Sequence, residues 1–315
     1  MIKLNSKIFI AGHNGLVGSS IHQLLKKKKY KKLLVRTRSQ LDLTNSKKVD
    51  FFFKKNKPEF IVICAAKVGG ILENSRYPTE FIINNLLIQN NILMAAKKYK
   101  VKRTIFLGSS CIYPKKSKIP IKEDYLLTEK LEETNEAYAI AKIAGLKLCE
   151  SIFKQYKKDI VGLMPTNVYG IKDNFDSNSS HVIPGMITKF LNAKNKNKNV
   201  YLWGSGKPIR EFIYDEDLAS AIFLILKLPQ KKILKVCKNK FPIINVGTGQ
   251  SYSIKRLATL IGKLINFKGK IIFDRNFPDG TIDKSLNTKK LRKLSWKPKI
   301  SFKLGLKRVI NSQNI

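Results

Sequence analysis

The stretch Ile8-Phe9-Ile10-Ala11-Gly12-His13-Asn14-Gly15-Leu16-Val17-Gly18 decides how this chain folds. Its apolar beginning predicts a buried strand over Lys7–Ala11, and the sequence after it predicts a helix over Val17–Lys28. Three glycines, spaced three apart, allow a tight turn between the two and a close approach of the backbone to a ligand. The N-terminus of a helix that follows such a turn favours a pyrophosphate. We therefore expect a dinucleotide to bind here, in contact with Gly12, Gly15, Leu16, Val17 and Gly18.

The alternation of strand and helix continues through the first half of the chain. Apolar runs bounded by turn residues predict strands over Lys32–Thr37, Phe60–Ala65, Thr104–Gly108 and Ile160–Met164. Apolar residues at helical spacing predict two long helices, over Pro78–Tyr99 and Thr134–Tyr156. Strands that alternate with helices in this way form a parallel sheet with helices on both faces. The predicted fold is therefore α/β, a Rossmann-type doubly wound parallel sheet.

The pattern changes after residue 175. Polar turns, a low-complexity loop over Asn192–Asn199 and short strands over Val200–Trp203 and Lys270–Phe273 predict a smaller, mixed α/β lobe. We expect residues 1–175 to form the dinucleotide-binding domain and 176–315 the substrate-binding lobe, with 210–228 as a segment that could return to the first domain. Ligands of such folds lie at the carboxyl ends of the strands, in the crevice between the lobes.

The composition is that of a folded intracellular protein. The 315 residues are 43% hydrophobic and 26% charged, which excludes a disordered chain. The four cysteines have no spacing typical of a metal site, so we expect no metal and a reducing, cytoplasmic location. The first predicted strand begins so early that it leaves no room for a signal peptide. Apolar runs are far shorter than the ~20 residues of a membrane-spanning helix, so we expect no membrane partner.

The formal net charge of +39 is extreme and raises the possibility of nucleic-acid binding. Nearly all of the basic residues are lysines, however, and they are scattered through almost every segment. Proteins that bind nucleic acid more often gather arginines and aromatic residues on one face. A general lysine bias on solvated surfaces explains the pattern better, and an anionic small-molecule substrate would still be attracted by such a field.

Two short motifs bear on the cofactor and on acid–base chemistry. Arg36-Thr37-Arg38 stands where an enzyme that uses NAD usually has an acid, and a cation such as Arg38 suits the 2′-phosphate of NADP. In the alternative interpretation, Arg36 and Arg38 are simply surface arginines. Asp42 and Leu43, just beyond them, could line the adenine pocket.

The second motif is a serine, a tyrosine and a lysine. Tyr138 and Lys142 lie one helical turn apart, and Ser109 follows a predicted strand. A tyrosine titrates near 10 on its own, so a neighbouring ammonium and a positively charged nicotinamide ring would be needed to lower its pKa. In the alternative interpretation, Tyr138 packs on an ordinary helix and Lys142 is solvated.

These motifs, in this order and over essentially the whole chain, resemble the extended short-chain dehydrogenase/reductase family. Further segments resemble the members of that family that act on GDP-sugars: 65–71, 108–114, 165–170, 180–184 and 203–212. The resemblance implies NADP(H) as the cofactor, with further contacts to it from Ala65, Ala66, Tyr138, Lys142, Pro165, Asn167, Val168 and His181. It implies a GDP-4-keto-6-deoxy-D-mannose substrate that is epimerised at C3 and C5 and then reduced at C4.

The resemblance also implies roles for individual side chains. Ser109 and Tyr138 would bind the C4 oxygen, which carries the enolate charge during epimerisation. Cys111 would be the base and His181 the acid on the opposite face of the ring. Contacts to the substrate would come from Ser109, Asn167, Lys189, Trp203, Arg210 and Lys284.

The chain departs from the family pattern at two positions. Asn14 stands in the glycine turn where many members have an arginine, and Asp283 precedes Lys284 where an arginine is usual. Three alternatives remain open: another nucleotide-sugar enzyme of the family, a non-enzymatic NADP-binding regulator, and a basic nucleic-acid-binding protein. The outer faces of the two long helices could join two copies of the chain in a homodimer.

Overall fold

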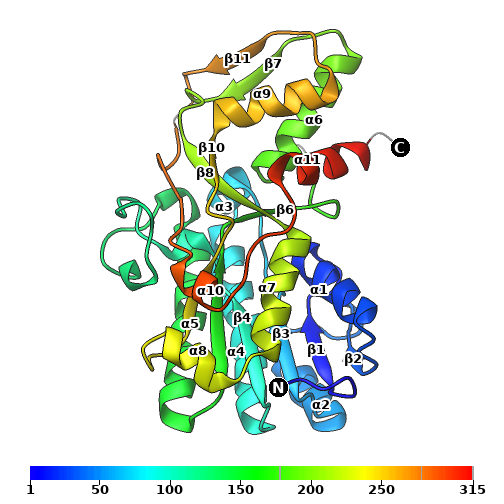
Figure 1. The fold of residues 1–315 in the computed structure, drawn as a ribbon, viewed down its shortest axis with the longest axis vertical. Helices are drawn as coiled ribbons and strands as arrows, with labels where there is room; N and C mark the ends of the chain where they lie inside the picture. Colours follow the sequence, from blue (N-terminus) through cyan, green and yellow to red (C-terminus); the bar gives the residue numbers. More distant parts are fainter. Residues whose placement is uncertain (177–178, 278, 314–315) are drawn as a thin grey trace.

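A computed structural model describes residues 1–176, 179–277 and 279–313, and Figure 1 shows its two lobes, one above the other. The lower lobe contains a six-stranded sheet with the order β2-β1-β3-β4-β5-β9. Every pairing in this sheet is parallel. Its strands are β1 (Ile8–Ala11), β2 (Leu33–Leu34), β3 (Phe60–Ile63), β4 (Arg103–Leu107), β5 (Ile160–Pro165) and β9 (Ile243–Val246).

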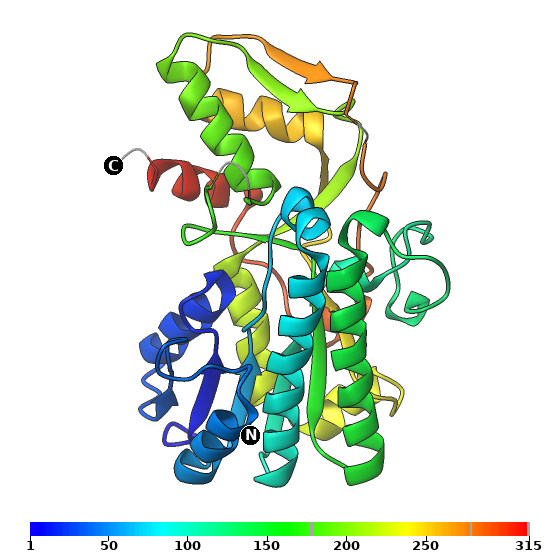
Figure 2. The ribbon, with the colours of Figure 1, turned by 180° about the vertical axis from the view of Figure 1, so that it is seen from behind.

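Strand β1 shows why the sheet is covered on both faces. Ile8 and Ile10 belong to a buried cluster that also contains residues of α1 (Leu16–Lys27) and α7 (Asp215–Lys227). Phe9 and Ala11 belong to a second cluster, on the side of α2 (Ser46–Asn56), α4 (Pro78–Lys98) and α5 (Glu136–Tyr156). Successive side chains of a strand point to opposite faces, so a run of four apolar residues fits a strand between two layers of helices. Figure 2 shows α4 and α5 side by side on the face opposite α1 and α7.

The upper lobe has a core of its own. Helices α6 (Val182–Asn195), α9 (Ile254–Ile265) and α11 (Phe302–Asn311) contribute most of its buried apolar residues. They pack with a parallel pair of strands, β7 (Val200–Trp203) and β11 (Ile271–Asp274). A three-stranded sheet of β10 (Ser251–Ser253), β8 (Ile209–Tyr214) and β6 (Asn167–Tyr169) lies where the two lobes meet (Figure 1).

Most of the predicted elements are present with ends that differ by one or two residues, and two predictions need correction. The strand expected over Lys32–Thr37 is reduced to Leu33–Leu34, because β2 is an edge strand that pairs with β1 only at Ile8 and Phe9. Helix α6 continues to Asn195, so the loop predicted over Asn192–Asn199 starts only after that residue.

The chain returns from the upper lobe to the lower one. Helix α7 packs on α1, and β9 extends the parallel sheet beside β5. Residues of α8 (Gln230–Val236) and α10 (Lys289–Lys293) also belong to the lower core. We therefore propose that residues 1–175 form the dinucleotide-binding domain together with returning segments, of which 210–228 is one. The short elements α3 (Ile71–Arg76), η1 (Ser110–Ile112), η2 (Glu123–Tyr125) and η3 (Glu133–Asn135) complete the fold.

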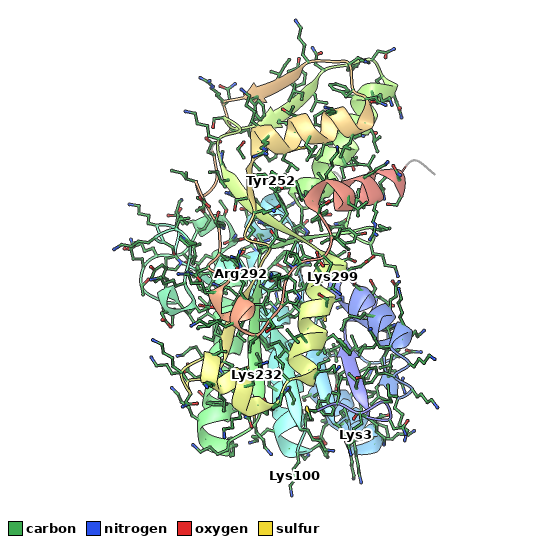
Figure 3. All side chains as sticks on the ribbon, viewed as in Figure 1. Lys3, Lys100, Lys232, Tyr252, Arg292 and Lys299 are labelled. Atoms are coloured by element: carbon green, nitrogen blue, oxygen red, sulfur yellow. The ribbon has the colours of Figure 1, made fainter. Side chains whose placement is uncertain are left out.

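The lysines do not gather on one surface. Figure 3 labels Lys3, Lys100 and Lys232, which project from separate parts of the lower lobe. Among the described residues, no helix is both long and apolar enough to cross a bilayer.

Candidate active site

The glycine turn between β1 and α1 is packed too closely for side chains. Gly12 has a φ of +83°, and a Cβ there would lie 2.7 Å from the backbone nitrogen of Ala65. A Cβ on Gly18 would overlap the carbonyl oxygen of Gly12. Gly15 precedes α1 in an extended conformation and contributes no side-chain cap, so the first N–H groups of α1, including those of Leu16 and Val17, are open to a ligand. This cradle fits the pyrophosphate of a dinucleotide.

The basic motif after β2 places its two arginines differently. The Arg36 guanidinium donates to the carbonyl of Val35 at 2.7 Å and lies 5.6 Å from the ring centre of Phe52. Arg38 is exposed, so it remains our candidate for the 2′-phosphate.

The two residues beyond it have structural partners. The carboxylate of Asp42 accepts hydrogen bonds from the backbone and hydroxyl of Thr44, at 3.0 and 2.7 Å, and these bonds lower its pKa. Leu43 packs against the core on the α2 and α4 side of the sheet. Ala65 and Ala66, after β3, are half-buried near the glycine turn.

The carboxyl end of β4 is the place where Ser109, Tyr138 and Lys142 meet. Ser109 follows β4, where its hydroxyl is hydrogen-bonded to the Tyr138 phenol and accepts from the backbone N–H of Cys111 at 3.2 Å. The Lys142 ammonium donates to the carbonyl of Leu107 at 2.9 Å and lies 5.8 Å from the centre of the Tyr138 ring. The bond to Leu107 holds the ammonium of this α5 residue at the end of β4, near the phenol ring.

Burial controls the ionisation of Tyr138 and Lys142. It raises the pKa of Tyr138, which the nearby Cys111 raises further, while the Ser109 hydrogen bond lowers it. Burial lowers the pKa of Lys142 to about 8. In the protein without cofactor, desolvation of the phenolate dominates the pKa of Tyr138; the expected lowering by Lys142 together with the nicotinamide ring remains a prediction. The resting phenol is a proton donor.

Cys111 lies in η1, half-buried, next to the serine and the tyrosine. Its sulfur accepts a hydrogen bond from the side-chain amide of Asn135 at 3.5 Å. It is also close enough to Arg210 to raise the pKa of that guanidinium, which burial lowers. Arg210 reaches this place from β8, where it donates to the carbonyl of Thr281 at 2.6 Å. Residues from both lobes thus surround the cysteine.

His181 lies at the start of α6, at the N-cap position. Its side chain is 45% exposed, and its Nδ1 is 3.5 Å from a carboxylate oxygen of Asp173.

The remaining predicted substrate residues lie mainly on the upper lobe and at the junction. Asn167, on β6, donates to the carbonyl of Glu211 at 2.9 Å. Trp203 stacks on Phe277 with ring centres 4.6 Å apart, and the Lys189 ammonium lies 5.3 Å from the centre of the indole. Lys284 lies close enough to Glu132 to lower the pKa of that carboxyl. Pro165 and Val168 lie at the end of β5 and in β6.

The sequence departs from the family pattern at Asn14 and Asp283, and the structure shows local partners for Asp283. The carboxylate of Asp283 accepts from the backbone and hydroxyl of Ser285, at 2.8 and 2.6 Å, so it is already hydrogen-bonded. Asn14 is exposed in the glycine turn.

Sequence reasoning missed several residues that the structure brings to the site. Asn135 precedes the predicted helix, and only its contact with Cys111 draws attention to it. Phe277 begins a stretch that resembles the family's turn before its last substrate contacts, but its pairing with Trp203, 74 positions away, could not be read from the sequence. Asp173 carried one available signal: it lies in the same polar loop as His181.

The comparisons with known proteins agree with this geometry. Residues 8–247 match the NAD dependent epimerase/dehydratase family, and the chain belongs to it.

Within that family, the chain is similar to enzymes that act on GDP-sugars. It is 45% identical to the GDP-L-fucose synthase of Escherichia coli K12 over 95% of this chain and 94% of that one. It is 44% identical to GDP-L-fucose synthase 1 of Arabidopsis thaliana over 96% and 91%. Among solved structures, the GDP-mannoheptose C4 reductase of Campylobacter jejuni with NADP bound superposes with a TM-score of 0.90 at 35% identity, with all of both chains covered.

Proposed function

We propose that this chain converts GDP-4-keto-6-deoxy-D-mannose into GDP-L-fucose by epimerising C3 and C5 and then reducing C4 with NADPH. The observation that supports this proposal most is the position of Cys111 beside the hydrogen-bonded Ser109 and Tyr138 pair. A thiol in this place is not needed for reduction of a ketone. Beside a group that binds the ketone oxygen, it can remove a proton from the adjacent carbon.

NADP(H) is the cofactor, as in the bound structure with a TM-score of 0.90. Bound NADPH supplies the hydride for C4. On this chain the cradle around Gly12 and Gly18 would hold the pyrophosphate, and Arg38 the 2′-phosphate. Lys142 would donate to the nicotinamide ribose while it remains fixed by the carbonyl of Leu107.

The Ser109 and Tyr138 hydroxyls serve both stages of the reaction. Both would donate to the C4 oxygen, first as the enolate oxygen and later as the forming alkoxide. A phenol whose pKa is raised by burial remains protonated until an oxyanion of higher basicity forms beside it. Tyr138 then gives its proton to that oxygen during reduction.

Epimerisation needs a base and an acid on opposite faces of the sugar ring. We assign the base to Cys111, whose sulfur accepts from Asn135; this donor would stabilise the thiolate. We assign the acid to His181, which enters from the upper lobe. The two residues come from elements of different lobes, an arrangement that allows the ring to lie between them.

Substrate binding would rely on the upper lobe. Arg210 and Lys284 would neutralise the diphosphate, and Asn167 would hydrogen-bond the sugar. The Trp203–Phe277 pair with Lys189 beside it offers a flat aromatic surface for the nucleotide.

The test is NADPH consumption on addition of GDP-4-keto-6-deoxy-D-mannose, with the product identified by NMR and Cys111→Ser run in parallel. We expect GDP-L-fucose from the wild type and, from the variant, a loss of inversion with the protein still folded. Formation of GDP-L-fucose by Cys111→Ser at the wild-type rate would refute the assignment of the base.

A C4 reductase that does not epimerise is the second candidate, since the Campylobacter structure carries that name at 35% identity. The same assay separates the two: a GDP-6-deoxy-D-hexose from the wild type, with no deuterium taken up from heavy water at C3 or C5, would establish the reductase. The free cysteines, Cys64, Cys111, Cys149 and Cys237, support the further proposal of a reducing, cytoplasmic location, which cell fractionation would test.

We also propose a homodimer through α4 and α5. These helices pack side by side on one face of the lower lobe (Figure 2). Ile83, Leu87 and Met94 of α4 are exposed large apolar side chains at helical spacing. Leu87→Glu should give a monomer in analytical ultracentrifugation, while Leu304→Glu, an exposed leucine on α11, should leave the dimer intact. A monomeric wild type at micromolar concentration would refute this proposal.

A further inference from the structure

Asp173 is a buried carboxylate that faces the imidazole of His181. Its Oδ1 lies 3.5 Å from Nδ1 of the histidine. The side chain of Asp173 is 4% exposed, whereas that of His181 is 45% exposed. A contact of this length is long for a hydrogen bond, as contacts between catalytic groups often are before substrate binds.

The loop around Asp173 holds the carboxylate in place. The Asp173 backbone N–H donates to the carbonyl of Gly170 at 3.2 Å, and Oδ1 accepts from the backbone N–H of Asn174 at 2.9 Å. The other oxygen, Oδ2, is buried and has no hydrogen-bond partner among the described residues. A buried carboxylate with an unused oxygen is costly unless a cation or donor satisfies it. The His181 ring is a donor 3.5 Å from Oδ1 of this carboxylate.

The backbone of His181 is also fixed. Its carbonyl accepts from the N–H of Gly185 in the first turn of α6, at 3.0 Å. Two residues earlier, the carbonyl of Ser179 accepts from the N–H of Gly70, in the loop before α3, at 3.0 Å. With the main chain held at both sides, the orientation and tautomer of the ring depend on what Nδ1 bonds to.

We propose that Asp173 is a positioning residue for His181: it accepts a hydrogen bond from Nδ1–H, keeps a proton on that nitrogen and turns Nε2 toward the sugar ring. The inference rests on the proposed function, in which His181 is the general acid. With Nδ1–H bonded to Asp173, the imidazolium gives up the proton of Nε2. The Nε2–H bond breaks, the electron pair of the enolate forms the new C–H bond, and the ring is left neutral with Nδ1–H in place.

The experiment compares Asp173→Asn, which keeps an oxygen acceptor without its charge, with Asp173→Ala, which removes both. Glu216→Gln is the control, because that carboxylate is 57% exposed and pairs with Arg308 instead. The chain has three histidines, so 15N-histidine labelling gives few ring signals, and that of His181 is assigned from a His181→Gln sample. We expect the proton on Nδ1 at pH 8.5 in the wild type, in Asp173→Asn and in Glu216→Gln, and on Nε2 in Asp173→Ala.

The second measurement is the rate of GDP-L-fucose formation and of deuterium uptake at C3 and C5. Removal of general-acid assistance costs about 10²-fold or more, so Asp173→Ala, which removes the acceptor, should lose at least about tenfold, and Asp173→Asn should lose less, with the affinity for NADPH unchanged in both. A wild-type ring protonated on Nε2, or a full rate in Asp173→Ala, would overturn the proposal; the first result holds even if Asp173→Ala does not fold. The NMR measurement needs no substrate. If the proposed function is wrong but the inference about Asp173 is right, the wild type will show no turnover and its His181 ring will still carry the proton on Nδ1.

Discussion

Asp215→Asn should make the protein more stable at alkaline pH and hardly change it at acid pH. Asp215 is the first residue of α7, is 8% exposed, and accepts from the N–H of Glu216 at 2.9 Å. Burial, with the negative charges of Glu216 and Asp173, raises its pKa from 3.8 to about 7. The folded chain therefore holds this proton more tightly than the unfolded chain. The stability that the neutral carboxyl contributes is fully present below about pH 4 and is lost as the pH rises through about 7.

The size of the effect follows from the pKa. The two pH units between pH 5 and a folded pKa of about 7 correspond to roughly 3 kcal/mol. At about 2 cal/mol/K of unfolding entropy per residue, a chain of 315 residues turns this into about 4 °C of melting temperature. The asparagine has no such dependence, so the Tm of the variant minus that of the wild type should increase by about 4 °C between pH 5 and pH 8.

Differential scanning calorimetry of both proteins, without cofactor, measures this difference directly. Other buried carboxyls such as Glu211 and Asp217 also have raised pKa values, but they are common to both proteins and cancel. Glu133→Gln is the control, since it removes an exposed carboxylate that does not contribute to the pKa shift of Asp215. A Tm difference that stays constant, or falls as the pH rises, would show that Asp215 is ionised in the folded protein at pH 5 and that the reasoning is wrong.

Three further predictions concern the cofactor, the acid–base group and the nucleotide. Gly18→Ala should lower the Tm of the cofactor-free protein and abolish the fluorescence change on NADPH addition, whereas Gly15→Ala, whose Cβ would meet its nearest neighbour at 3.5 Å, should leave the cofactor-free Tm unchanged. Lys142→Met should lower kcat/KM in the NADPH assay by about 10²-fold or more, and a smaller loss would argue against its proposed role in positioning the nicotinamide ribose. Trp203→Ala should raise the KM for the GDP-sugar about fivefold or more with kcat within about twofold, and Tyr201→Ala, exposed on the same strand, should change neither.

The parallel sheet was predictable because its strands are buried on both faces. The run Ile8–Ala11 is apolar at every position, and the glycine turn follows it without interruption. Strand β9 was missed because it joins the sheet after the chain has built part of the upper lobe. Its short run, Ile243–Val246, contains Asn245, which is fully buried and donates to the carbonyl of Ile121. Tertiary partners, not a local pattern, make that asparagine compatible with a fully buried position on this edge strand.

In the candidate site, too, some features could be predicted from local sequence motifs and others could not. Residues within one local motif, such as Tyr138 and Lys142, could be placed together from their spacing on a helix. The direction of the tyrosine pKa shift could not be predicted, because it depends on how deeply the folded chain buries the phenol. Asp173 and Phe277 act through contacts that only the folded chain creates.

One continuous segment, β8 followed by α7, connects the parts of this site across the two lobes. Arg210 in β8 lies near Cys111, while the backbone carbonyl of the next residue, Glu211, accepts from both Thr166 and Asn167. Asp215, four residues after Glu211, begins α7, and the nearby Asp173 faces His181. In the proposed mechanism, this one segment runs from a contact of the proposed base, Cys111, to the surroundings of Asp173, the proposed positioning residue of the acid, so the fold would place both groups before the substrate binds.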